Sequence, residues 1–247
     1  MRALAMVAFP AAVLGVALAS APVQAATRPH RGDAQVQAVV ERDLKDRDIE
    51  GVTVAVTGGD VVLTGMVPNA WSRSEAEQVA IRERDVKSVT NRLTVARGES
   101  DAAVARTVAE RLRRYVLYSV FDDVSVGVQD GQVALTGEVT AGFKANDLAR
   151  IASKVRGVQG VRNDIRTLPA SLFDDQLRAA IASRIYGDPM FESYALQVPP
   201  PIHIVVENGH VTLTGAVGTE VERVKAGFTT RAVFGVMSVD NELRVAA

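Results

Sequence analysis

Three arginines and three aromatic residues cluster near the middle of the sequence. The cluster comprises Arg111, Arg113, Arg114, Tyr115, Tyr118 and Phe121. An arginine close to an anionic lipid surface contributes on the order of 1 kcal/mol to binding, and tyrosine tolerates the boundary between water and lipid. The cluster therefore predicts weak, salt-sensitive binding to an anionic phospholipid surface. The alternative is an ordinary solvated helix end, where arginine offsets the helix dipole.

Residues suited to catalysis or metal binding are few. The three histidines are His30, His203 and His210, and without a recurring carboxylate they make a poor zinc site. We expect His203, on the outward face of an alternating strand, and His210, beside a turn, to be solvated surface residues. The sequence has no nucleophile elbow, phosphate loop or HExxH run. It predicts a non-enzymatic protein with no catalytic residues, no metal site and no cofactor.

The composition excludes several classes of protein. The 247 residues include 28 lysines and arginines against 29 aspartates and glutamates, which argues against a strongly basic protein that binds nucleic acid. A hydrophobic fraction of 47% argues against disorder. There is no cysteine, so we expect no disulfide, no thiolate metal site, no cysteine nucleophile and no lipid-modified N-terminal cysteine.

The segments around these residues recur three times. The run GDVVLTG from Gly59 matches GQVALTG from Gly131 and GHVTLTG from Gly209, at offsets of 72 and 78. The same offsets relate two further sets: the asparagines Asn91, Asn163 and Asn241, and the glycines Gly65, Gly137 and Gly215. We expect the asparagines to satisfy backbone groups. We expect the glycines to supply a backbone angle or a close approach.

Each copy predicts the same order of elements: helix, strand, strand, helix, strand. Asp33, Asp101 and Asp174 open the copies and can cap the first helix, whose apolar residues recur every four positions, as at 36, 40 and 44. A tight turn of Gly-Gly, Asp-Gly or Asn-Gly then joins two strands. The fold class is α+β, with three tandem αββαβ units at 33–95, 101–168 and 174–245. Each unit forms a small three-stranded sheet with two helices packed on one face.

The copies differ most between the first helix and the first strand. This connection is polar and spans 45–51 in copy one, but it is longer and richer in apolar residues at 113–123 and 186–201. Long apolar connections either pack against a neighbouring copy or form a binding surface. The candidate partner-binding residues of the third copy are Tyr186, Met190, Phe191 and Tyr194.

Charge also separates the copies. Copy two has 10 basic and 8 acidic residues and a net charge of +2, whereas copies one and three each carry −3. The arginine cluster therefore lies in the only basic copy.

The first 25 residues are typical of a secretory signal peptide. Arg2 precedes an apolar stretch that ends in small residues, with Val23-Gln24-Ala25 as the expected cleavage site. An uncleaved membrane anchor is the alternative. We expect cleavage and a periplasmic mature protein.

The repeated motifs resemble those of a known family. Val-x-Leu-Thr-Gly follows each hairpin, and Gly-Val-x-x-Val-x-Asn-x-Ile spans 157–165. This pattern is similar to the BON domain family, found in osmotically inducible periplasmic proteins and in outer-membrane lipoproteins with tandem copies. The resemblance covers nearly all of 33–245. It implies an envelope protein without enzymatic activity that binds phospholipid surfaces or protein partners.

Two functions are consistent with these features. The first is binding to anionic phospholipid through copy two, in a protein that contributes to stress or osmotic protection. The second is a protein-interaction or chaperone-like role for envelope proteins, through the apolar connections of copies two and three.

Overall fold

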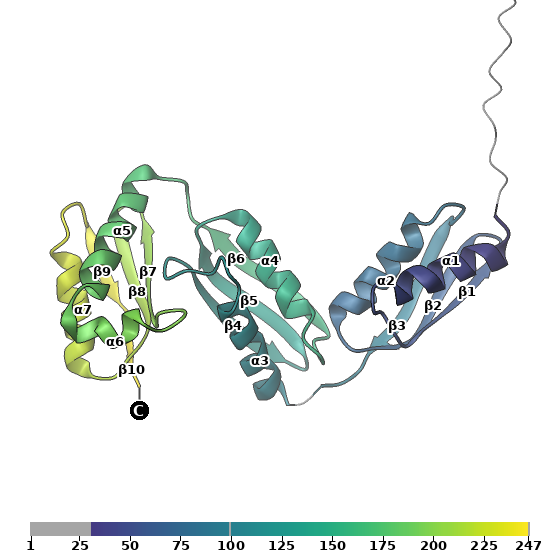
Figure 1. Ribbon diagram of the computed structural model, residues 1–247, viewed down its shortest axis with the longest axis horizontal. Helices are drawn as coiled ribbons and strands as arrows, with labels where there is room; N and C mark the ends of the chain where they lie inside the picture. Colours follow the sequence, from purple (N-terminus) through teal and green to yellow (C-terminus); the bar gives the residue numbers. More distant parts are fainter. Residues whose placement is uncertain (1–30, 99, 247) are drawn as a thin grey trace, which may run out of the picture. The chain divides into compact units, whose positions relative to one another are not determined.

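The structure, a computed structural model, describes residues 31–98 and 100–246. The predicted signal peptide at 1–25 lies outside these residues. Three domains follow one another, and each has the predicted order of elements (Figure 1). Within the described residues, no helix is long and apolar enough to cross a membrane.

The first domain consists of five elements. They are α1 (Asp33–Lys45), β1 (Val52–Thr57), β2 (Asp60–Val67), α2 (Ala70–Arg82) and β3 (Ser88–Val95). The central strand β2 pairs antiparallel with β1 and parallel with β3. This topology follows from the connections, because β1 and β2 share a tight hairpin whereas α2 carries the chain across to a parallel partner.

The second domain repeats this arrangement. Its elements are α3 (Asp101–Arg113), β4 (Asp123–Gln129), β5 (Gln132–Val139), α4 (Gly142–Ser153) and β6 (Gly160–Thr167). The strand order is β4-β5-β6, with the hairpin pair antiparallel and the crossover pair parallel.

The third domain adds two short helices to the same plan. Its elements are α5 (Leu172–Tyr186), the 3-10 helix η1 (Pro189–Phe191), α6 (Glu192–Ala195), β7 (Ile202–Glu207), β8 (His210–Val217), α7 (Glu220–Arg231), β9 (Ser238–Asn241) and β10 (Arg244–Val245). The predicted single last strand over 239–245 is divided into β9 and β10, and both parts pair parallel with β8.

Each domain has its own apolar core. The predicted helical stripes are buried, as Val36, Val40 and Leu44 show in α1, and their counterparts in α3 and α5 are buried too. They pack with the inward residues of the sheet and with the second helix in three separate clusters. The amphipathic pattern alone therefore accounts for the α+β layering.

The repeated aspartates have a different role from the predicted helix cap. Both residues of every hairpin turn have positive φ, so their N–H groups point out of the turn. The carboxylate of Asp174 accepts hydrogen bonds from the N–H groups of Asn208 and Gly209, each at 2.9 Å. Asp33 and Asp101 bind their own turns in the same way. We call this repeated contact the aspartate clamp.

The repeated glycines and asparagines are structural, as expected. Gly65, Gly137 and Gly215 have φ of 120°, 116° and 105°, and a Cβ at each would lie within 2.2 Å of a carbonyl oxygen at or just before the start of the paired strand. In all three domains the asparagine amide donates to a carbonyl of the second helix, and its oxygen accepts from the residue two positions on. Asparagine thus ties the last strand to that helix.

Candidate functional site

The C-terminal end of α3 forms an exposed basic and apolar surface. Arg111, Arg113 and Arg114 are exposed because the buried stripe of α3 occupies the opposite face. The chain then turns, and it leaves Val116 88% and Leu117 47% exposed. We call these five residues the α3 tip. Sequence reasoning did not single out Val116 and Leu117, although both lie inside the apolar connection at 113–123.

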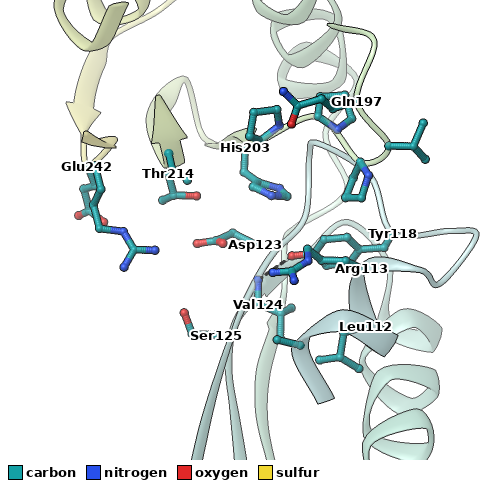
Figure 2. A pocket seen from close by; sticks show the side chains of 18 residues that line it. Leu112, Arg113, Tyr118, Asp123, Val124, Ser125, Gln197, His203, Thr214 and Glu242 are labelled. Atoms are coloured by element: carbon teal, nitrogen blue, oxygen red, sulfur yellow. Dashed lines mark hydrogen bonds between the residues drawn. The ribbon is translucent and has the colours of Figure 1, made fainter. Parts of the chain in front are cut away.

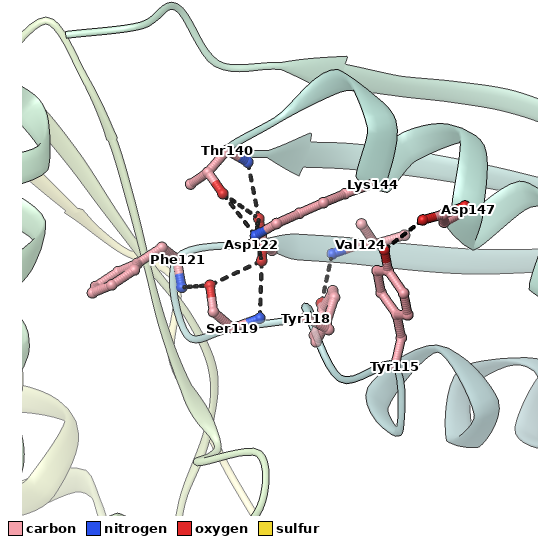
Figure 3. Close-up of polar contacts among 9 residues, drawn as sticks. All are labelled: Tyr115, Tyr118, Ser119, Phe121, Asp122, Val124, Thr140, Lys144 and Asp147. Carbon is pink, nitrogen blue, oxygen red and sulfur yellow. Dashed lines mark hydrogen bonds and ion pairs between the residues drawn. The ribbon is translucent and has the colours of Figure 1, made fainter.

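The three aromatic residues of the predicted cluster are half-buried. The two tyrosines are bonded to the second domain beneath the α3 tip. The Tyr115 hydroxyl donates to Asp147 Oδ2 at 2.5 Å, and the Tyr118 hydroxyl accepts from the Val124 N–H at 3.1 Å (Figure 3). Burial raises the pKa of Tyr118, so this hydroxyl stays neutral. Phe121 packs against the core of the third domain.

A buried ion pair fixes the end of the same connection. Asp122 is completely buried, and one of its oxygens lies 2.7 Å from the Nζ atom of Lys144 (Figure 3). Its carboxylate also accepts hydrogen bonds from the N–H and hydroxyl groups of Ser119 and Thr140. Burial raises the pKa of Asp122, but Lys144 and these donors outweigh it, so the pKa is lowered overall. Asp122 is therefore a charged anchor for the connection behind the α3 tip.

His203 is not the solvated surface residue predicted from the sequence. It is only 9% exposed, and its ring meets the edge of Tyr118 at a centroid distance of 5.7 Å. Strand β7 is buried on both faces from Ile202 to Val206, because the connection of the second domain lies against it. The Ile204 N–H donates to the Val120 carbonyl at 2.6 Å. Burial lowers the pKa of His203, against the opposing pull of Asp123. By contrast, His210 is exposed, as expected.

A cleft of about 640 Å³ opens beside His203 (Figure 2). Its charged lining residues are Arg113, Asp123, Glu242 and Arg244. Two cations and two carboxylates cancel, so the cleft has no excess charge with which to select an ion. Among the described residues, no group of three or more histidines and acidic residues could hold a metal ion.

The predicted partner-binding residues of the third domain separate into core and surface. Phe191 is completely buried, so it belongs to the core and not to a partner-binding surface. Tyr186 and Tyr194 are half-buried, with hydroxyls bonded to the Ile202 carbonyl and to Glu222. Met190 is 41% exposed. The most exposed apolar residues of this connection are Leu196 and Val198, at 81% and 97%.

The fold and the surface define a protein of three tandem small α+β domains, one of which carries an exposed basic and apolar helix end. The chain belongs to the BON domain family, whose family model matches residues 32–97, 100–169 and 173–247. The resemblance inferred from the repeated motifs is thus confirmed.

Two relatives resemble about half of the chain. The outer membrane lipoprotein DolP of Haemophilus influenzae is 33% identical over 132 residues, which cover 51% of this chain and 68% of that protein. An uncharacterised protein of Anaplasma centrale, encoded in the gshII 5′ region, is 28% identical over 141 residues, or 54% of this chain and 93% of that protein. The chain is therefore related to a protein of the bacterial cell envelope.

Solved structures of type III secretion proteins are also similar. The C-terminal domain of CdsD from Chlamydia trachomatis is 17% identical with a TM-score of 0.25, and the match covers 87% of this chain and 96% of that one. A periplasmic fragment of PrgH from S. typhimurium is 13% identical with a TM-score of 0.21, over 79% and 99% of the two chains.

Proposed function

We propose that the protein is a non-enzymatic periplasmic envelope protein that binds anionic phospholipid surfaces through the α3 tip. In this proposal residues 1–25 are a cleaved signal peptide, and the protein contributes to stress or osmotic protection. The observation that carries the proposal is Val116, an 88% exposed valine beside the exposed Arg113 and Arg114 of the only basic domain. The kinship with an outer membrane lipoprotein supports the envelope location.

The geometry of the α3 tip suits the surface of a bilayer. Val116 and Leu117 can enter the boundary between headgroups and acyl chains while the arginines meet lipid phosphates. Arg114 also pairs with Glu110 at 2.7 Å, which reduces the charge it offers to lipid. Binding is therefore weak and falls as salt screens the arginines. Tyr115 and Tyr118 contribute by holding the tip in place, and Phe121 by fixing the end of the connection against the third domain.

The test is co-sedimentation with phosphatidylglycerol vesicles at low salt. Replacing all three arginines (R111Q/R113Q/R114Q) is expected to weaken partitioning about 10- to 100-fold, at about 1 kcal/mol or less for each arginine. Adding Val116→Asp to this triple variant is expected to weaken vesicle partitioning further, because a carboxylate would have to enter the boundary between headgroups and acyl chains.

A matched control removes the same number of charges elsewhere. R42Q/R92Q/R162Q changes three exposed arginines outside the α3 tip and is expected to leave vesicle binding nearly unchanged. Equal loss in both triple variants would show that only net charge matters. Unchanged binding by the R111Q/R113Q/R114Q variant would refute the proposed surface.

Exposed apolar residues in the third domain favour the second candidate function, binding of envelope proteins. Met190, Leu196 and Val198 are exposed in the connection at 186–201. Replacing all three by Ser is expected to abolish protection of an unfolded client in a light-scattering aggregation assay. Full protection by this variant would remove the connection from any chaperone-like role. The R111Q/R113Q/R114Q variant is the control, because it is expected to lose vesicle binding but to keep protection of the client.

A further inference from the structure

The second helix of the third domain exposes a stripe of large apolar side chains. Val221, Val224 and Phe228 lie on one face of α7 and are 65%, 57% and 68% exposed. Phe234 follows the helix and is 98% exposed. We call these four residues the α7 stripe. Within the described residues, the hydrogen bonds and ion pairs of α7 join it to other parts of the third domain.

Three of the four positions of the α7 stripe are apolar in the third domain alone. The repeat offsets place polar residues at its last three positions in the other copies: Ser74, Gln78 and Arg84 in the first domain, and Asn146, Arg150 and Arg156 in the second. The BON fold therefore does not require apolar residues there. Since monomeric proteins rarely leave such a patch exposed without a use for it, the stripe indicates an interaction surface.

The charged residues at the two ends of α7 favour a second copy of the same helix as the partner. Glu220 lies in the first turn of α7, where it pairs with Arg223, and Arg231 lies in the last turn. They are about three turns apart and so lie along the same edge of the stripe. When two copies of this helix pack antiparallel about a two-fold axis, the acidic end of one edge meets the basic end of the same edge on the partner. The helix is thus complementary in charge to a second copy of itself.

An interface already inside the chain uses the same helix ends. The Nζ atom of Lys154, which follows the end of α4, lies over the ring of Trp71 near the start of α2, 4.4 Å from the ring centroid. The Ala70 N–H also donates to the Val158 carbonyl at 2.8 Å. By the repeat offsets, Trp71 corresponds to Val221 and Lys154 to Ala232. The start of one second helix therefore already meets the end of another between domains one and two.

We propose that α7 is a self-association face, through which two copies of the chain form a dimer with their α7 helices antiparallel. The dimer buries the α7 stripes against each other and sets Glu220 of each copy opposite Arg231 of the other. This inference concerns a different domain from the proposed lipid surface and does not depend on it. A membrane is the weaker partner, because the third unit has a net charge of −3 and anionic lipid repels it.

The size of the patch sets the expected strength. At 68% and 98% exposure, Phe228 and Phe234 together expose roughly 250–400 Å², since an aromatic side chain offers about 150–250 Å². With the two valines, a pair of copies buries on the order of 1,000 Å², near the lower limit for a specific interface. The dimer is therefore weak, with a dissociation constant in the micromolar range or above.

The test is analytical ultracentrifugation of the purified chain from micromolar to about millimolar concentration. The unmodified chain is expected to shift from monomer to dimer, and Phe228→Glu to remain monomeric. Glu220→Arg and Arg231→Glu are each expected to weaken the dimer several-fold, and the double swap to restore it. Dimerisation is restored by the double swap only if residue 220 of one copy contacts residue 231 of the other directly.

A matched control places the same substitution on the second domain. Arg150→Glu at the position equivalent to Phe228 is expected to leave the dimer unchanged. A chain that stays monomeric throughout would overturn the proposal, as would a dimer that survives both Phe228→Glu and the single charge variants. Vesicle binding that Phe228→Glu abolishes in an otherwise monomeric chain would assign the stripe to a membrane instead. If Phe228→Glu does not fold, the two single charge variants and the double swap still test the proposed dimer.

Discussion

Replacing Asp122 by Ala is expected to lower the free energy of unfolding of the second domain by roughly 3–5 kcal/mol, the usual cost of removing one partner of a buried ion pair. The variant leaves the ammonium group of Lys144, which is only 8% exposed, without its counter-charge. It also leaves the N–H groups of Ser119 and Thr140 without their acceptor. The measurement is urea denaturation followed by circular dichroism.

The control is an exposed ion pair in the same domain. Asp164 pairs with Arg162 at 2.7 Å, and both side chains are about half exposed or more. Asp164→Ala is therefore expected to cost no more than about 1 kcal/mol. If the Asp122 and Asp164 variants lose the same stability, Asp122 does not anchor the connection.

The stability that Asp122 contributes is expected to be lost at acid pH. Its pKa is lowered in the folded protein, so the unfolded chain takes up the proton first as the pH falls. The contribution of Asp122 is complete above the unfolded value of about 3.9 and is lost as the pH falls through the lower folded value. The stability difference between the unmodified chain and Asp122→Asn should therefore shrink at acid pH.

The second large effect concerns the aspartate clamp. Asp174→Ala is expected to destabilise the third domain by roughly 3–6 kcal/mol, because it removes two charge-assisted hydrogen bonds worth about 1.5–3 kcal/mol each. Asp174 is only 1% exposed, so water cannot take its place at the turn. The N–H of Gly209, which is buried, is left without an acceptor.

The other two domains supply a graded comparison. Asp33 and Asp101 make the same contacts but are half-buried. Their Ala variants should lose less stability than Asp174→Ala, because solvent partly replaces the carboxylate. Thermal unfolding of the three variants measures the order. A loss at Asp33 as large as that at Asp174 would mean that burial does not set the strength of the clamp.

Most of the fold could be predicted from the sequence because its signals are local and occur three times. The four-residue spacing of Val36, Val40 and Leu44 specifies a helix face, and Asp130-Gly131 specifies a tight turn. The clamp could not be predicted in this way. Its hydrogen bonds join residues 25 to 35 positions apart, and an aspartate at a helix start has an equally good local explanation as a cap.

The candidate site was only partly predictable. The arginines of the α3 tip are exposed as expected, because helical periodicity decides which residues face solvent. His203 was predicted wrongly because alternation within one strand carries no information about a neighbouring domain covering its outer face. Phe191 was placed on a binding surface because a long connection does not reveal which of its side chains folds back into the core.

The clamp has an evolutionary consequence. It ties the first helix directly to the hairpin, so the segment between them is not what positions the sheet. That segment has 7, 11 and 16 residues in the three domains, while the hairpin register stays the same. Doubling the length of such a loop costs only about 0.6 kcal/mol in closure entropy. Each domain thus provides a natural grafting point where new recognition sequences can be inserted and diversified without redesigning the scaffold.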